Sequence, residues 1–176
     1  MELLGLKFDN YTNGSGTDPH NEYNLCYMLF PYIPNSLRGE ITKRNILCDV
    51  INSDGRRPFT TKEIVQMFGG LVDALMAMHN ANLSHRDVKL ENVLLQSIGY
   101  GDSIPASGGA YTPVLMDFGS AGPIATQLNT RQQVLTVIEN AETHTTVSYR
   151  PPELFEGGVR QGPREVCLDY GKVDVW

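Results

Sequence analysis

The stretch from Ser84 to Leu95 constrains this chain more than any other part of its sequence. It reads Ser-His-Arg-Asp-Val-Lys-Leu-Glu-Asn-Val-Leu-Leu, which places an Asp, a Lys and an Asn in one short polar segment. The apolar run that closes the stretch predicts a short strand. An Asp that accepts a hydroxyl proton, a Lys that meets a phosphate and an Asn that holds a metal ion are groups that phosphoryl transfer requires.

A second set of polar groups follows the next predicted strand. Residues 113–116, Pro-Val-Leu-Met, predict that strand, and Asp117-Phe118-Gly119 comes directly after it. The Gly-, Ser- and Pro-rich residues 97–112 between the two strands predict a hairpin insertion. The hairpin would bring Asn92 and Asp117 to neighbouring strand ends, where both are candidate metal ligands.

The first 80 residues predict two strands and two helices. Residues 3–8 and 23–30 predict adjacent antiparallel strands around a loop at 9–22, and the apolar run 23–30 predicts a largely buried strand. Ser36 is expected to cap a short helix over 37–41, and Thr60 or Thr61 to begin a stronger helix that ends near His79. Its predicted core face consists of Ile64, Met67, Phe68, Leu71, Leu75 and Met78.

The last third predicts little regular structure. Residues 120–145 are rich in Thr, Gln and Asn and predict an exposed mobile segment, with one or two helical turns at 132–140. Pro151-Pro152-Glu153 follows, and residues 156–172 predict a second loose segment. Residues 173–176 resemble the opening of a helix.

Composition excludes some classes of protein. A net charge of −6 argues against a general nucleic-acid binder. Cys26, Cys48 and Cys167 form no C-x-x-C pair, so we expect reduced thiols in an intracellular protein and no zinc site. The sequence contains no recognisable signal peptide and no apolar run long enough for a membrane span.

The three motifs in this order resemble the protein kinases. Lys89, two residues after Asp87, and Thr146, three residues before Tyr149, are similar to the serine/threonine branch. Residues 113–120, 131–135 and 147–155 resemble the Numb-associated kinase family, in particular its small myristoylated-and-palmitoylated branch. The resemblance covers about residues 23–176.

The resemblance implies an α+β, protein-kinase-like bilobal fold, which we expect to be incomplete. Residues 1–33 would be a remnant of the small lobe with the hinge, and residues 34–176 a partial large lobe with the catalytic loop and activation segment. No Gly-rich loop or Lys-bearing strand is recognisable before Tyr23. We therefore expect a fragment that exposes apolar faces, such as the one through Phe68 and Leu71, and that has negligible activity alone.

The resemblance also implies individual roles. Asp87 would orient a substrate hydroxyl and accept its proton, and Lys89 would neutralise charge on the transferred phosphoryl group. Asn92 and Asp117 would hold Mg²⁺ against the phosphates of ATP. The hinge would meet the adenine edge and Leu94 would pack beneath the adenine. The hinge residues are Phe30, Pro31, Tyr32 and Ile33.

Further residues are given supporting roles by the same resemblance. His85 and Phe118 would stack in an apolar column, and Arg86 would form a socket for a phosphate on the activation segment. Asp174 would anchor the backbone of the catalytic loop, and Glu153 would form a structural ion pair. The remaining histidines have no convergent partners in the sequence and receive no role: His20, His79 and His144.

Three functions remain open from the sequence. The first is a serine/threonine protein kinase that uses ATP and Mg²⁺ on a protein substrate, present as a fragment. The second is a truncated or pseudokinase-like scaffold that binds partners without catalysis. The presence of all four polar residues that the chemistry needs argues against it: Asp87, Lys89, Asn92 and Asp117. The third is a small-molecule kinase, which the Asp-Phe-Gly and Pro-Pro-Glu motifs disfavour. The resemblance implies an intracellular, cytoplasmic location, with peripheral association of the parent protein at Golgi or endosomal membranes.

Overall fold

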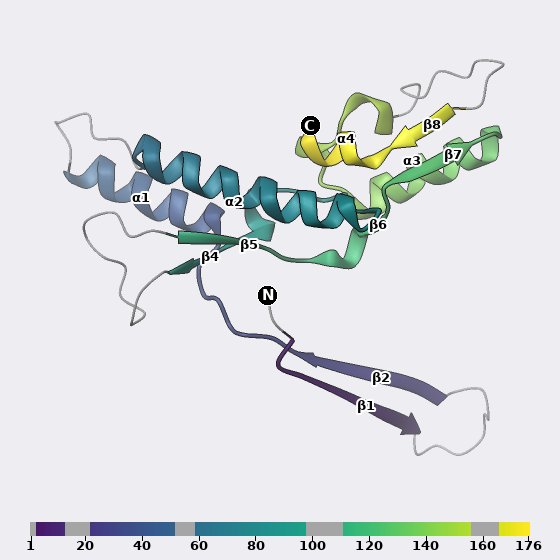
Figure 1. Ribbon diagram of the computed structural model, residues 1–176, viewed down its shortest axis with the longest axis horizontal. Helices are drawn as coiled ribbons and strands as arrows, with labels where there is room; N and C mark the ends of the chain where they lie inside the picture. Colours follow the sequence, from purple (N-terminus) through teal and green to yellow (C-terminus); the bar gives the residue numbers. More distant parts are fainter. Residues whose placement is uncertain (1–2, 13–21, 52–58, 98–110, 156–165) are drawn as a thin grey trace. The chain divides into compact units, whose positions relative to one another are not determined.

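The computed structural model describes residues 3–12, 22–51, 59–97, 111–155 and 166–176, which Figure 1 draws as coloured ribbon. The chain divides into two compact units, Met1–Ile33 and Pro34–Trp176. Both helices and strands are present, as the α+β prediction requires.

The first unit is a two-stranded antiparallel ribbon of β1 (Gly5–Thr12) and β2 (Glu22–Leu29). The predicted pairing is therefore confirmed, but the predicted loop is wrong at both ends, where residues 9–12 and 22 lie in strands. Its middle, residues 13–21, lies outside the described residues. The expected burial of the second strand is wrong for residues 26–30, whose side chains are exposed, because the described part of this unit has no second layer to cover the ribbon.

The second unit contains four helices, three two-stranded sheets and several short 3-10 turns within its described residues. In chain order these elements are α1 (Leu37–Ile51), α2 (Thr61–Asn80), β3 (Leu83–Ser84), η1 (Leu90–Asn92), β4 (Val93–Ser97), β5 (Tyr111–Leu115), η2 (Phe118–Ser120), β6 (Gly122–Pro123), β7 (Ala125–Leu128), α3 (Arg131–His144), η3 (Val147–Tyr149), η4 (Pro152–Leu154), β8 (Val166–Asp169) and α4 (Tyr170–Val175).

Side-chain caps explain where the first two helices of this unit begin. The Ser36 hydroxyl accepts a hydrogen bond from the Gly39 amide at 3.1 Å, as predicted, although α1 extends ten residues beyond the expected end at Ile41. Thr60 and Glu63 form a capping box at the start of α2, which confirms the predicted boundary. Arg44 on α1 bonds Glu63 at 2.9 Å and thereby joins the two helices.

The β4–β5 hairpin confirms the two strands predicted around the insertion. The predicted bounds are wrong at Ser97, Tyr111 and Thr112, which lie in strands, and at Met116, which lies beyond β5. Val93 pairs with Leu115 and Ser97 with Tyr111; residues 98–110 lie outside the described residues. The hairpin packs along α2 (Figure 1). Gly70 permits this close contact, because a Cβ there would lie 2.7 Å from the Pro113 ring.

The predicted core face of α2 is only partly correct. Met67 and Leu75 are buried, and Leu71 and Met78 are partly buried against β4 and β5. Ile64 and Phe68 are instead 52% and 67% exposed. Among the described residues, no helix has the length and apolar character of a membrane span.

The segment expected to be mobile has a core of its own. Helix α3 exceeds the predicted one or two turns and buries four apolar side chains against β7, β8, η4 and α4. Its capping box joins Thr130 and Gln133, a signal that was present in the sequence. Residues 166–172, predicted to be loose, form β8 and the start of α4, which begins at Tyr170 with Asp169 as its cap. Residues 156–165 lie outside the described residues.

Candidate active site

Asp87 lies at the centre of the site and is largely buried. One carboxylate oxygen accepts hydrogen bonds from the Thr146 amide at 3.0 Å and the Thr146 hydroxyl at 2.8 Å. The other accepts from Lys89 Nζ at 2.7 Å and Asn92 Nδ2 at 3.1 Å. The structure thus joins a loop of six residues to a threonine 59 positions further along the chain.

The surroundings of Asp87 keep it ionised. Burial alone would raise the pKa of this carboxyl, but the hydrogen bonds from Lys89 and Thr146 outweigh burial, and the pKa lies below its usual value. The hydrogen bond to Asp87 raises the pKa of Lys89 in turn. At neutral pH the pair is therefore a carboxylate beside an ammonium group, with Lys89 Nζ also 2.9 Å from the Thr146 hydroxyl.

Asn92 and Asp117 lie at adjacent strand ends, as the hairpin predicted. The Met116 amide donates to the Asn92 carbonyl at 2.9 Å, which fixes the residue before Asp117 against the end of η1. The Asn92 amide nitrogen donates twice to Asp87, so its amide oxygen is the atom left for a ligand. Asp117 is exposed and adopts a left-handed conformation with φ 65°, which is uncommon for a residue other than glycine and marks a constrained position.

The donor set suits a hard cation. Among the described residues, no group of three His, Cys, Asp or Glu side chains converges on one point. One amide oxygen and one carboxylate are nevertheless a suitable protein contribution to a Mg²⁺ site, since Mg²⁺ is commonly held by one or two carboxylates together with substrate phosphates.

The burial and contacts of His85 indicate a structural role. Its side chain is fully buried, and Nε2 lies 2.9 Å from the Met116 carbonyl, to which it donates. The Phe118 ring packs against it with centroids 5.4 Å apart, so the predicted stack is present. With its ring enclosed and bonded, His85 is not available as a base for substrate.

Asp174 anchors the loop from α4, as predicted. Its carboxylate accepts from the His85 amide at 2.9 Å and the Arg86 amide at 2.7 Å. Arg86 has φ 68°, so these bonds hold a backbone conformation that a residue other than glycine rarely adopts. His79, to which the sequence assigned no role, is bonded to the same carboxylate.

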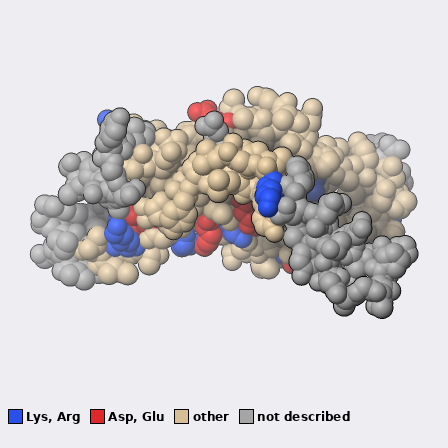
Figure 2. All heavy atoms as spheres, turned by 90° about the horizontal axis from the view of Figure 1, so that it is seen from below, with Lys and Arg blue, Asp and Glu red and all other residues tan. Residues whose placement is uncertain are grey.

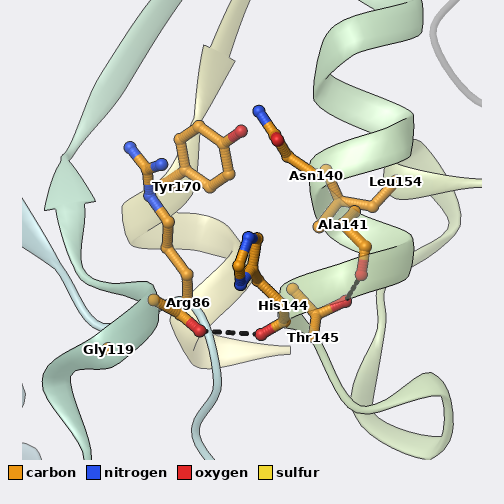
Figure 3. A pocket seen from close by; sticks show the side chains of 9 residues that line it. Arg86, Gly119, Asn140, Ala141, His144, Thr145, Leu154 and Tyr170 are labelled. Atoms are coloured by element: carbon orange, nitrogen blue, oxygen red, sulfur yellow. Dashed lines mark hydrogen bonds between the residues drawn. The ribbon is translucent and has the colours of Figure 1, made fainter. Parts of the chain in front are cut away.

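Arg86 lines a cavity of about 240 Å³ between the catalytic loop and α3 (Figure 3). Its guanidinium stacks on the Tyr170 ring at 3.7 Å and donates to the Pro123 carbonyl at 2.6 Å. A Cβ at Gly122 would lie 2.7 Å from the guanidinium, so a larger residue there would displace the end of the Arg86 side chain. His144 also lines the cavity, and its carbonyl accepts a bond from Ser120.

Arg150 is a buried cation to which the sequence analysis gave no role. It donates to the Ala141 carbonyl at 2.9 Å and to the hydroxyl and carbonyl of Thr145 at 2.8 Å and 3.2 Å. These bonds tie the end of α3 to the residue preceding Thr146. The only sequence signal for a structural role of Arg150 is its position next to Pro151. Glu153, expected to form an ion pair, forms none with the described residues, and residues 156–165 lie outside the described part of the chain.

The expected nucleotide-contacting residues fall in both units. Leu94 lies in β4, half-buried and bridged to Ser36 in the second unit. The hinge residues follow β2 in the first unit and stay a prediction: Phe30, Pro31, Tyr32 and Ile33.

Charge near the site is mixed in sign. Arg38 on α1 forms an ion pair with Glu91 at 2.9 Å, and in the middle of the face shown in Figure 2 basic side chains lie beside acidic ones.

Comparison with known proteins agrees with this geometry. The family described as protein kinase domain matches residues 21–176. Serine/threonine-protein kinase ppk30 of Schizosaccharomyces pombe is 33% identical over 132 residues, which cover 74% of this chain and 12% of that protein. Serine/threonine-protein kinase 16 of Homo sapiens is 32% identical over 117 residues, which cover 66% of this chain and 32% of that protein. The chain thus spans a third or less of the length of either relative.

Proposed function

The chain belongs to the protein kinase domain family, and from that premise we propose that it carries the phosphoryl-transfer centre of a serine/threonine protein kinase. Its reaction would move the γ-phosphoryl group of ATP to a Ser or Thr hydroxyl of a protein. The observation that carries this proposal is the hydrogen-bonded set of Asp87, Lys89 and Thr146.

The chemistry follows from the position of these groups. Asp87 would orient the attacking hydroxyl and receive its proton, as a carboxylate that is already ionised and held at both oxygens. Lys89 would place its positive charge beside the transferred phosphoryl group. Thr146 would hold the substrate-side loop against Asp87, so that the hydroxyl and the phosphoryl group meet in a fixed geometry.

The residues fit a magnesium nucleotide. Asn92 would contribute its amide oxygen and Asp117 a carboxylate oxygen, which agrees with the donor set that Mg²⁺ prefers beside phosphates. Bound Mg²⁺ neutralises charge on the phosphates during transfer. We propose that Leu94 packs beneath the adenine and that residues 30–33 meet its edge, with residues 1–33 corresponding to the small lobe and hinge and residues 34–176 to the large lobe.

The finer assignment also remains a proposal. The sequence resemblance to the Numb-associated kinase family and its myristoylated-and-palmitoylated branch supports a protein substrate bearing Ser or Thr and peripheral membrane association of the parent protein. The position of Arg86 on the wall of the cavity supports the proposal that it binds a phosphate on the activation segment, because a guanidinium is suited to bind a phosphoryl group.

A second candidate is a scaffold that binds partners without catalysis. The exposed apolar side chains on α2 favour it, since Ile64 and Phe68 lie on one face of that helix. Purified chain that binds a partner but transfers no phosphate would favour this candidate.

Transfer of labelled phosphate from ATP to casein, with Mg²⁺, tests the kinase proposal. Asp87→Asn keeps the size of the side chain but removes the base, and we expect transfer to fall by about 10²–10⁴-fold. Asp73→Asn is the matched control, because Asp73 is exposed on α2. The label should be found on Ser or Thr. Measurable transfer that is equal in wild type and Asp87→Asn would contradict the proposal.

A further inference from the structure

An exposed ion pair beside the site joins three segments of the second unit. Arg38, in the first turn of α1, donates from Nε to Glu91 Oε1 at 2.9 Å and from Nη2 to the Tyr149 hydroxyl at 3.2 Å. These two bonds span 53 and 111 positions of the sequence. Arg38 thereby connects α1 to both η1 and η3, which carry Glu91 and Tyr149.

Both of these turns adjoin groups that hold Asp87. Glu91 immediately precedes Asn92, whose amide nitrogen donates to the Asp87 carboxylate. Tyr149 ends the turn that follows Thr146, and its amide donates to the Thr146 carbonyl at 2.9 Å. Because consecutive Cα atoms are about 3.8 Å apart, a substrate residue two or three positions from a hydroxyl at Asp87 can reach the ion pair.

The two charged groups are accessible to a ligand. Each of the two side chains is 46% exposed, and the hydrogen bond from Arg38 lowers the pKa of Glu91, which is therefore a carboxylate at neutral pH. A guanidinium carries more N–H donors than these two bonds use. An exposed ion pair contributes little to stability, because water and salt screen it. A substrate can therefore compete for either charge without unfolding the site.

Mutual neutralisation decides which residues this surface accepts. Glu91 alone would attract a basic residue of a substrate, and Arg38 alone would attract an acidic one. With their atoms 2.9 Å apart, each group already has its counter-charge, so a charged substrate residue gains only by breaking the pair. An uncharged polar residue can instead bond the remaining N–H groups while the pair stays intact.

We propose that Arg38 and Glu91 are specificity-determining residues, which select a protein substrate with uncharged residues close to its acceptor Ser or Thr. Arg38 masks Glu91 against basic residues, and Glu91 masks Arg38 against acidic ones. The inference rests on the proposed kinase function for the kind of ligand, and it adds the charge that this ligand carries beside its acceptor.

Removal of Arg38 should expose the charge of Glu91. Lys89 lies two positions before Glu91, but its Nζ is bonded to Asp87 at 2.7 Å and to the Thr146 hydroxyl at 2.9 Å. These bonds keep the ammonium group at Asp87. The carboxylate of Glu91 should then attract a basic substrate residue in the Arg38→Met variant.

Peptide binding tests the masking without any need for phosphate transfer. The probes are three fluorescent peptides with Ala in place of the acceptor and with Lys, Glu or Gln at the second and third positions on both sides of it. Fluorescence anisotropy measures each affinity, and wild type should bind the Gln peptide at least as tightly as the charged ones. Arg38→Met should improve the Lys peptide about fivefold relative to the Gln peptide, and Glu91→Gln should improve the Glu peptide by a similar factor.

Two further variants separate masking from other effects. Lys43→Met removes a positive charge from an exposed position on the same helix and should keep the wild-type order of affinities. The double variant Arg38→Met/Glu91→Gln carries neither charge and should lose both acquired preferences. A merely structural defect would weaken all three peptides alike.

Three results would overturn the proposal. They are a wild-type preference of more than about threefold for a charged peptide, an unchanged order of affinities in both single variants, and no measurable binding of any peptide by wild type. If Arg38→Met does not fold, Glu91→Gln decides through the opposite preference, for the Glu peptide.

Kinetics distinguishes this proposal from the kinase function. With Ser in place of Ala, the ratio of kcat/KM for the Lys peptide to that for the Gln peptide should rise about fivefold in Arg38→Met. Wild type that binds the peptides but phosphorylates none of them would contradict the kinase function, while the binding order would still decide the masking. Active wild type whose ratios do not change in either single variant would contradict the masking alone.

Discussion

Two regions of the molecule supply groups to Asp87, and they do so by different means. In the motif region, defined as residues 83–97 and 111–117, Lys89 and Asn92 lie within five positions of Asp87. In the return segment, residues 118–155, Thr146 reaches the same carboxylate across 59 positions. Local spacing encodes the first set of contacts, whereas the second depends on how α3 and the residues after it pack.

The difference predicts how each region responds to substitution. In the motif region, Asp117 is exposed and is a proposed metal ligand, so its loss should reduce chemistry more than stability. Arg150 in the return segment satisfies buried backbone groups, so its loss should reduce stability first. The variants below test this division.

Asp117→Ala should have the largest effect, on activity. It removes a proposed metal ligand, and loss of several kcal/mol of charge stabilisation corresponds to a decrease in phosphoryl transfer of more than about a hundredfold. The side chain is exposed, and its hydrogen bond from the Gly119 amide is 3.4 Å long, so the free energy of unfolding should change by less than about 1 kcal/mol. Transfer of labelled phosphate and urea unfolding measure the two quantities. A variant that lost stability but retained activity would contradict the expected difference between the motif region and the return segment.

Arg150→Met should have the largest effect on stability. The Thr145 carbonyl would lose its bond from Arg150, at a cost of about 1–3 kcal/mol, whereas the Ala141 carbonyl would keep its bonds from the Thr145 amide and hydroxyl. Urea unfolding measures the loss. Arg131→Met is the matched control, since Arg131 is exposed in the first turn of α3 and its removal should change stability by about 0.5 kcal/mol or less. Equal losses in both variants would show that α3 is not held by Arg150.

The same division separates what the sequence could predict from what it could not. The order of Asp87, Lys89, Asn92 and Asp117 predicted the hairpin and the contacts at its strand ends, because those contacts depend on short spacing and strand pairing. The ends of α2 were also predictable, since the Thr60 capping box is a local signal.

The return segment was misjudged because its apolar residues are few and separated by Thr, Gln and Asn. Helix α3 buries Val134, Val137, Ile138 and Ala141, which is a helical spacing, but its polar composition suggested an exposed segment. The contact of His79 with Asp174 has no sequence signal at all, because two elements 95 positions apart must pack before the pair exists.

Thr146→Val tests the contact between the two regions. Valine keeps the β-branched shape but loses the hydroxyl that bonds Asp87 and Lys89. One lost hydrogen bond to a charged group corresponds to a decrease in kcat of about tenfold. Thr146→Ser, which keeps the hydroxyl, is the control and should retain most of the activity. A decrease of equal size in both variants would assign the effect to packing.

The smallest expected effect concerns the pKa of Asp87, to which both regions contribute. The pKa of the folded carboxyl lies below its unfolded value of about 4, so the unfolded state binds more protons in the acid range and stability rises with pH there. The stabilisation is present above about pH 4 and is lost as the pH falls through the folded pKa.

Titration of the Asp87 carboxyl, followed by ¹³C resonance, would show how much each region lowers the pKa of Asp87. Lys89 lowers the pKa more than either hydrogen bond from Thr146 does, because it adds an ammonium charge to its hydrogen bond. Lys89→Met should therefore raise the pKa of Asp87 further than Thr146→Val, which leaves the Thr146 amide bond in place. The opposite order would mean that the return segment, and not the local loop, controls the ionisation of the catalytic carboxylate.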